Sequence, residues 1–245
     1  MKNVCLVISY IGSLYSGFQK QKNGLSVQEV IEKAIFDITG ENSKLTPSGR
    51  TDSGVHALGQ VANFLTNSTI PANKFFIPLN QILPLDIRVV ESREVPLSFN
   101  ARKSAKQKTY LYKMYFGKVL SALDEGRVLH VKYKVDFDLM EKACQMLVGE
   151  HDFRAFMSSG SSTKTTIRTI YSSVIKRQGD YADFEITGNG FLYNMVRILI
   201  GTILDIGRNK ITLSDFEKLL QGAHRTQAGK TSPAHALYLK SVVYD

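Results

Sequence analysis

The sequence has few of the residues that build disulfide frameworks or metal centres. Among 245 residues there are two cysteines, Cys5 and Cys144, and each lies in a segment of apolar periodicity. We therefore expect neither a disulfide framework nor a cysteine-based zinc site. The five histidines include no pair at metal-ligand spacing. Two separate cysteines are typical of a reducing cytosol, so a cytoplasmic location is expected.

Long apolar runs and nucleotide-binding motifs are missing as well. The most apolar stretch, around 195–206, contains Arg197 and is too short to span a bilayer. The N-terminus enters strand-like sequence without a signal-peptide pattern. The sequence contains no Walker A motif, and no G-x-G-x-x-G follows the first predicted strand. These absences argue against a membrane protein and against a nucleotide cofactor.

Positive charge is in excess. Lys and Arg number 31 and Asp and Glu number 22, which gives a formal net charge of +9 and a pI near 9.4. The hydrophobic fraction of 43%, with only six prolines, indicates a folded chain rather than a disordered one. Such a charge favours an anionic partner, most often nucleic acid. A simply basic, solvated surface would give the same number.

The apolar pattern predicts an α+β protein made of two ferredoxin-like (RRM-like) β-α-β-β-α-β units, residues 1–98 and 105–245, with a basic cleft between them. We expect strands at 3–10, 44–47, 57–66, 86–95, 109–116, 166–176, 180–187 and 236–244. We expect helices at 27–38, 73–82, 136–148 and 191–206, and a shorter one near 214.

Local signals mark the ends of these helices. Ser26 and Glu29 form a capping box before the first helix, and Gly40 follows its last periodic residue. Ser214 and Glu217 suggest a second capping box. Pro78 is expected to end or kink the helix that contains it.

A glycine-bracketed loop, SGRTDSGVHA at 48–57, holds a cation, a carboxylate and an imidazole close together. Glycine allows backbone conformations that aim side chains at a ligand. Asp52 is the best catalytic candidate in the chain. The alternative is an Asx turn between strands, in which Asp52 bonds to its own backbone.

Arg197 is the only formal charge between Phe191 and Leu204. A guanidinium on a mostly buried helix requires a carboxylate partner, because an unpaired buried charge costs several kcal/mol. Alternatively, Arg197 lies on a narrow solvated stripe beside Asn194 and extends to water.

Aromatic and basic residues are mixed in FNARKSAKQKTYLYKMYF at 99–116. Cations bind phosphates and aromatic rings stack on bases, so this mixture is typical of RNA recognition. Strand alternation places Tyr110, Tyr112 and Met114 on one face. For Tyr112, a core position is the simpler interpretation.

Taken together, these segments resemble the TruA-type pseudouridine synthases, which modify the tRNA anticodon arm. The loop SGRTDSGVHA carries most of the resemblance. Five other blocks follow in the family's order: YSGFQ at 15–19, FNARKSAKQKTYLY at 99–112, HDFRAF at 151–156, GNGFLYNMVR at 188–197 and PAHALYL at 233–239.

The resemblance implies roles for five residues. Asp52 matches the catalytic aspartate, and Arg197 matches the arginine paired with it. Tyr110 matches the tyrosine that stacks on the target uridine, and Arg50 matches the residue that helps to hold this base out of its stack. Leu237 is expected to line the base pocket.

The resemblance also implies the substrate and the assembly. The substrate would be tRNA, modified at uridines 38, 39 and 40 of the anticodon stem-loop, and the enzyme would be a homodimer. The reaction needs neither cofactor nor metal.

Two other interpretations remain open. A non-catalytic RNA-binding protein with two RRM-like units explains the charge, although the sequence contains no RNP1 motif. A metal-dependent nuclease would need clustered carboxylates, and none follows Asp52 within twenty residues.

Overall fold

The computed structural model describes residues 1–21, 24–160 and 163–244. Their contacts divide the chain into two compact units. The first unit comprises Met1–Lys106 together with Tyr238–Asp245, and the second comprises Gln107–Leu237.

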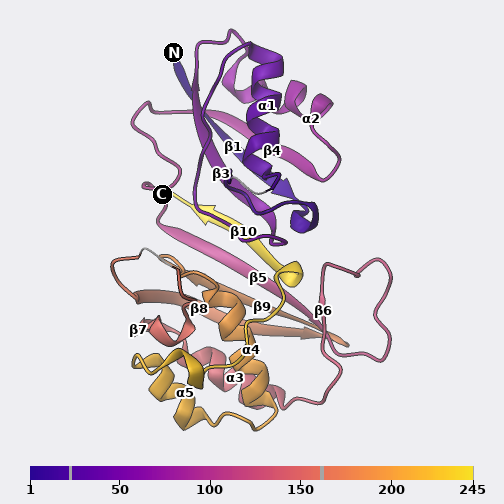
Figure 1. Ribbon diagram of the computed structural model, residues 1–245, viewed down its shortest axis with the longest axis vertical. Coiled ribbons are helices and arrows are strands. Elements are labelled where there is room, and N and C mark those ends of the chain that lie inside the picture. Colours follow the sequence, from indigo (N-terminus) through magenta and orange to yellow (C-terminus); the bar gives the residue numbers. More distant parts are fainter. Residues whose placement is uncertain (22–23, 161–162, 245) are drawn as a thin grey trace. The chain divides into compact units, whose positions relative to one another are not determined.

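The first unit is a mostly antiparallel sheet with two helices against one face (Figure 1). Its elements are β1 (Lys2–Tyr10), α1 (Val27–Thr39), β2 (Thr46–Pro47), β3 (His56–Thr66), α2 (Phe76–Ile82), β4 (Ile87–Val95) and β10 (Leu237–Val243), with 3-10 turns at Gly12–Leu14 and Ala72–Lys74. The strand order is β4-β1-β3, and β2 pairs antiparallel with β3. β10 pairs parallel with β3.

The core of this unit follows strand alternation. Val4, Leu6 and Ile8 on β1 are fully buried. Phe64, opposite Val4 on β3, meets Phe75 edge-on at a ring-centroid distance of 5.4 Å. Burying side chains of this size contributes about 1.5–3 kcal/mol each. The helices therefore cover the face of the sheet that these residues share.

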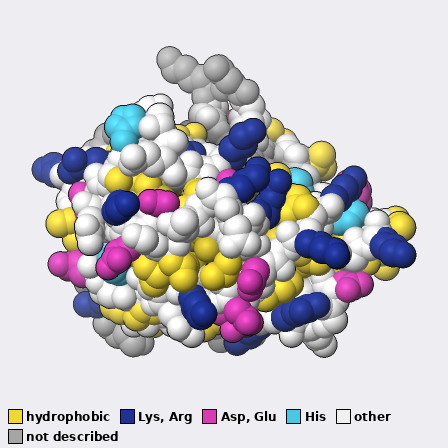
Figure 2. Space-filling view, turned by 90° about the horizontal axis from the view of Figure 1, so that it is seen from below, with side chains coloured by type: hydrophobic (Ala, Val, Ile, Leu, Met, Phe, Trp, Pro, Cys, Tyr) yellow, Lys and Arg dark blue, Asp and Glu magenta, His cyan; other side chains and the backbone are white. Residues whose placement is uncertain are grey.

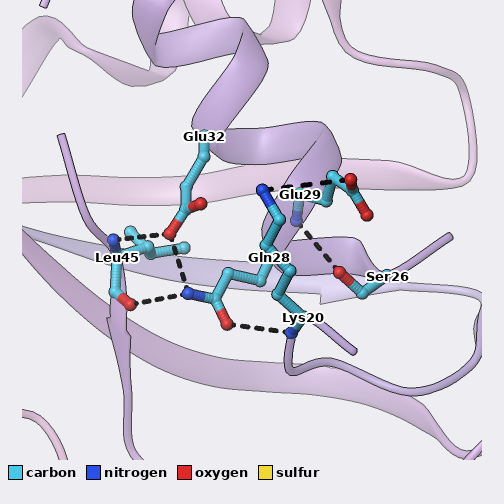
Figure 3. Close-up of polar contacts among 6 residues, drawn as sticks. All are labelled: Lys20, Ser26, Gln28, Glu29, Glu32 and Leu45. Carbon is cyan, nitrogen blue, oxygen red and sulfur yellow. Dashed lines mark hydrogen bonds and ion pairs between the residues drawn. The ribbon is translucent and has the colours of Figure 1, made fainter. Parts of the chain in front are cut away.

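The N-terminal end of α1 is fixed by polar contacts (Figure 3). The Ser26 side chain accepts a hydrogen bond from the Glu29 amide at 3.2 Å, as the capping box predicts. In the same turn, the buried Gln28 side chain donates from Nε2 to the Leu45 carbonyl at 3.0 Å, and its Oε1 accepts from the Lys20 amide at 3.1 Å. Glu32 accepts from the Leu45 amide at 2.9 Å. Gln28 and Glu32 thus tie α1 to two segments distant in sequence.

The second unit has the sheet order β5-β9-β8-β7, antiparallel throughout, with β6 parallel to β5 (Figure 1). Its elements are β5 (Gln107–Tyr115), β6 (Leu129–His130), α3 (Phe137–Met146), β7 (Gly149–Asp152), β8 (Ile167–Gln178), β9 (Tyr181–Gly188), α4 (Met195–Gly207) and α5 (Leu213–Leu220), with 3-10 turns at Phe153–Phe156, Arg225–Gln227 and Ala234–Ala236.

The predicted α+β class is confirmed, and most strand pairs are antiparallel. The closing strand, however, groups with the first unit, because Tyr238 and Leu239 pair with His56 and Ala57. The predicted domain boundaries, 1–98 and 105–245, stay a prediction.

Several helix ends differ from the prediction. α4 begins at Met195 rather than at Phe191, because Asn194 adopts a left-handed conformation with φ 61°. The short helix α5 is capped by Thr212, whose hydroxyl accepts from the Asp215 amide at 3.1 Å, and not by Ser214.

Pro78 neither ends nor breaks α2. The helix begins only at Phe76, so Pro78 lies in the first turn, where no intrahelical partner for its missing N–H is needed. Among the described residues, no helix is both long and apolar enough to cross a membrane, and this includes the apolar α4.

Gln28 provides a test of the polar contacts around α1. Gln28→Ala leaves the buried Leu45 carbonyl and the Lys20 amide without these partners, so the free energy of unfolding should fall by about 1–3 kcal/mol in urea titrations. The control is Lys33→Ala on the same helix, which removes only an exposed ion pair with Asp37 and should cost less than about 1 kcal/mol. Equal losses in the two variants would contradict this account.

The buried thiols predict how stability depends on pH. Burial raises the pKa of Cys144 from 9.0 to about 12 and that of Cys5 to about 11. Above pH 9 the unfolded chain loses these protons and the folded chain keeps them, so stability is full below pH 9 and falls as the pH rises towards these values.

The comparison is between wild type and Cys144→Ala, unfolded in urea between pH 8 and 10.5. The variant is less stable overall, but its loss of stability across this range should be smaller by about 2 kcal/mol, because one titrating group is gone. Parallel curves would show that Cys144 titrates normally in the folded protein.

Candidate active site

The loop that carries Asp52 begins at a buried anchor. The side chain of Ser48 is fully buried and donates to Gln60 Oε1 at 2.6 Å. The Gln60 amide in turn donates to the Gly49 carbonyl at 3.1 Å, and the Ser48 amide donates to the Val61 carbonyl at 2.7 Å. Because these groups are shielded from water, their hydrogen bonds fix the loop where it leaves β2.

Thr51 joins the loop to the segment 15–19. Its hydroxyl shares a buried hydrogen bond of 2.7 Å with the Tyr10 hydroxyl. Its carbonyl accepts from the Phe18 amide at 3.3 Å. Gly17 makes this approach possible: it has φ +99°, and a Cβ there would lie 2.4 Å from the Thr51 carbonyl oxygen.

A turn at Gly54 returns the chain to β3. Gly54 has φ 79°, and the Val55 amide donates to the Asp52 carbonyl at 3.1 Å. Thr51 and Val55 are buried on either side, whereas Asp52 is half-buried. Its carboxylate is thus carried by a turn whose backbone is fixed on both sides.

His56 ends the loop and has a structural role here. It is 1% exposed, and its Nδ1 accepts from the Gly12 amide at 3.0 Å. Its ring stacks on Tyr238 with centroids 4.7 Å apart. Because Nδ1 accepts a hydrogen bond, it carries no proton. The imidazole therefore holds the loop in place and is not exposed to a substrate.

Arg50 is the exposed cation of the loop, and its Nε donates to Gln19 Oε1. The segment 15–19 therefore contacts the loop at Arg50 as well as at Thr51. Apart from the resemblance, nothing in the sequence of this segment points to these contacts.

In the second unit, Tyr110 lies at the more exposed end of an aromatic row on β5. Tyr110, Tyr112 and Met114 pair with Ile186, Phe184 and Ala182 on β9, so they share one face, as predicted. Tyr112 and Met114 are fully buried, whereas Tyr110 is half-buried and meets Phe191 edge-on at 5.0 Å between ring centroids.

Arg197 lies in the first turn of α4 and is half-buried. Its Nε donates to the Ser232 carbonyl at 2.8 Å, and its Nη1 donates to Asn194 Oδ1 at 2.8 Å. The Ser232 amide returns a hydrogen bond of 3.1 Å to the Arg197 carbonyl. These two acceptors fix the direction of the guanidinium.

Leu237 is the first residue of β10 and is 5% exposed. The five predicted site residues thus divide between the units. Arg50 and Asp52 lie on one loop of the first unit. Tyr110 and Arg197 lie in the second unit, as does Leu237, because only the β10 residues from Tyr238 onward group with the first.

The basic residues are spread over several segments. Arg102, Lys103, Lys106 and Lys164 are exposed. Arg168 donates to the Thr165 carbonyl at 3.0 Å, and burial lowers its pKa. On the face in Figure 2, Lys and Arg side chains lie scattered, with acidic side chains between them and apolar ones in the middle. Within the described residues, no group of three or more His, Cys, Asp or Glu side chains could hold a metal ion.

Comparison with known proteins identifies the family. A family model described as tRNA pseudouridine synthase matches residues 6–102 and 143–245. The chain is 49% identical over 244 residues to tRNA pseudouridine synthase A of Acetivibrio thermocellus. The corresponding proteins of Caldicellulosiruptor saccharolyticus and Caldicellulosiruptor bescii are 49% and 47% identical over 244 residues. Each alignment covers 100% of both chains.

The chain therefore belongs to the tRNA pseudouridine synthase family. Enzymes of this family are isomerases that convert uridine to pseudouridine.

Gly17 tests how far the loop depends on its neighbours. Gly17→Ala forces a side chain into a left-handed conformation and against the Thr51 carbonyl, so the loop must shift. Because a misplacement of about 1 Å can cost about a hundredfold in rate, we expect kcat to fall at least about tenfold.

The matched control is Gly126→Ala. Gly126 also has a positive φ of 69°, but a Cβ there would meet nothing within 4 Å. This variant should keep the wild-type kcat although it also places an alanine at a positive φ. Equal kcat values in the two variants would show that the contact between Gly17 and Thr51 does not matter for turnover.

Proposed function

We propose that this protein isomerises uridine to pseudouridine at positions 38, 39 and 40 of the tRNA anticodon stem-loop, with Asp52 as the catalytic carboxylate. Family membership supports the reaction class. The observation that carries the choice of Asp52 is its place in the loop. It is a half-buried carboxylate on a turn whose flanking residues are buried and hydrogen-bonded.

The reaction breaks the C1′–N1 bond of uridine and joins C1′ to C5 of the same base. N1 gains a proton and C5 loses one, so the product is an isomer of the substrate. The target base must leave its stack, which costs a few kcal/mol and costs less in a loop. Asp52 acts on the nucleoside, and either Asp52 or Tyr110 accepts the C5 proton.

Arg197 pairs with Asp52 in this proposal. A guanidinium close to a carboxylate favours the ionised form, and the attraction is stronger where water is excluded. The hydrogen bonds from Nε to the Ser232 carbonyl and from Nη1 to Asn194 support such a role, because they hold the guanidinium in one orientation. A planar guanidinium can then present its remaining N–H groups to a carboxylate.

The other site residues contact the target base. Tyr110 stacks on the uracil, since its half-buried ring lies at the exposed end of the aromatic row. Leu237 supplies an apolar wall, and Arg50 helps to hold the base outside its stack. The resemblance of the segments around these residues supports each role.

We further propose that both units are ferredoxin-like and that a basic cleft between them receives the tRNA. The strand order β4-β1-β3-β2 supports the ferredoxin-like assignment of the first unit. The exposed Arg102, Lys103 and Lys106 support the basic cleft, because cations near the cleft would bind the phosphate backbone.

A cytoplasmic homodimer completes the proposal. The two cysteines are unpaired, which fits a reducing compartment. Light scattering coupled to size exclusion should give twice the monomer mass of 27.4 kDa.

Asp52→Asn tests the catalytic assignment. The amide keeps the shape of the side chain but cannot serve as an ionised carboxylate, so release of tritium from tRNA labelled at uridine C5 should fall by at least about a thousandfold, whereas tRNA affinity should change less than about threefold. EDTA should not alter the wild-type rate. In the wild type, chemical mapping of the product should place pseudouridine at positions 38, 39 and 40.

The control is Asp37→Asn, which alters an exposed carboxylate on α1. It should release tritium at the wild-type rate. Unchanged release in Asp52→Asn would rule out the catalytic role of Asp52. A wild-type protein that binds tRNA but releases no tritium would support the non-catalytic RNA-binding alternative.

A further inference from the structure

Arg225 lies in a short 3-10 turn, far from Arg197 in sequence, and holds the loop that follows it. Its Nη1 donates to the Gly229 carbonyl at 3.0 Å and to the Ala228 carbonyl at 3.4 Å. Its Nη2 donates to Thr231 Oγ1 at 3.3 Å. One guanidinium thus bridges three points of the segment 228–231.

This segment leads directly to the residue that orients Arg197. The Ser232 carbonyl accepts from Arg197 Nε at 2.8 Å, and the Ser232 amide donates to the Arg197 carbonyl at 3.1 Å. At the next residue, the Pro233 carbonyl accepts from the buried Tyr112 hydroxyl at 3.0 Å. The position of the 228–233 loop therefore determines where Arg197 finds its acceptor.

The loop also packs directly on α4. A Cβ at Gly201 would lie 1.8 Å from the Lys230 carbonyl oxygen, so the two backbones are in close contact. The Gly229 amide donates to the Thr202 hydroxyl at 3.0 Å. A shift of the loop would therefore displace the first two turns of α4, which include Arg197.

The charge of Arg225 needs an explanation. It is half-buried, burial lowers its pKa, and within the described part of the chain its recorded partners are neutral oxygens. An arginine used only to hold a loop gains from its rigid fork of five donors, which a lysine cannot reproduce. An arginine used as a phosphate contact needs mainly its charge, which a lysine supplies.

We propose that Arg225 is a positioning residue for Arg197. It fixes the 228–233 loop, so that the Ser232 carbonyl orients the Arg197 guanidinium. The number and geometry of its backbone contacts favour this role over a phosphate contact. The inference rests on the proposed function, because it assigns Arg225 an effect on turnover through the catalytic role of Arg197.

The kinetic test compares Arg225→Lys and Arg225→Gln with Lys210→Gln, an exposed cation elsewhere in the unit. Positioning predicts that both Arg225 variants lose about tenfold to a hundredfold in kcat, with KM for tRNA and its salt dependence unchanged. Lys210→Gln should resemble wild type.

Two kinetic results would overturn the proposal. If Arg225→Lys restores wild-type kcat while Arg225→Gln raises KM and lowers the salt slope by about one, Arg225 is a phosphate contact. If neither variant changes turnover, Arg225 has no role in it.

A second readout does not depend on catalysis. In a spectrum of arginine Nε–H groups, the Arg197 signal of the free wild-type protein should exchange slowly, because it is hydrogen-bonded to Ser232, and should exchange at least tenfold faster in Arg225→Gln. Unchanged exchange would overturn the proposal.

The same spectrum separates this inference from the proposed function. If exchange accelerates in Arg225→Gln but Asp52→Asn retains full activity, the positioning contact exists and the catalytic assignment fails. Should the Arg225 variants unfold, Thr231→Val removes a single acceptor and should change kcat and exchange in the same direction, about threefold or more. A Thr231→Val protein identical to wild type in both would then overturn the proposal.

Discussion

The side chain of Gln60 is completely buried on β3, and its amide group holds the start of the loop that carries Asp52. Nothing in apolar packing alone would set the direction of a polar loop that joins two strands. A buried amide can do so, because each unsatisfied group would cost about 1–3 kcal/mol and only one arrangement satisfies Ser48 and Gly49 together. The position of Asp52 depends on these hydrogen bonds of Gln60 and on the contacts that Thr51 and His56 make further along the loop.

The second unit uses the same principle for a residue of opposite charge. Arg197 is oriented by the Ser232 carbonyl and by Asn194, which are neutral groups. Both acceptors fix the direction of the guanidinium. A charged side chain held in this way does not have to reorient during a reaction. Such preorganisation is the main source of electrostatic catalysis in a water-excluded site.

Elements set by local signals could be predicted from the sequence. The capping residue Ser26 and the stop at Gly40 located α1, and a run rich in β-branched residues located β1. Elements that depend on distant partners could not. β7 is a strand of four residues, GEHD, with no apolar alternation, and it exists because it pairs with β8. The grouping of β10 with the first unit likewise follows from its pairing with β3.

The candidate site shows the same division. Asp52 and Arg197 stood out from the sequence as a carboxylate in a glycine loop and a lone charge on an apolar helix, and the resemblance supplied their roles. The groups that hold them in place were not visible there. In the sequence, Ser48 and Gln60 are ordinary polar residues, and His56 resembles a catalytic group. The need for glycine at position 17 is evident only from its close contact with the Thr51 carbonyl.

We infer from these contacts that the loop from Ser48 to His56 is fixed before any RNA binds. Amide hydrogen exchange in the free protein tests this directly. The amides to follow are those that donate the hydrogen bonds of the loop: Ser48, Phe18, Val55 and Gly12. The account predicts protection comparable to that of β3 core amides such as Phe64, because these hydrogen bonds open only with the surrounding structure. Fast exchange of these amides in the free protein, with protection appearing only when tRNA is added, would contradict it.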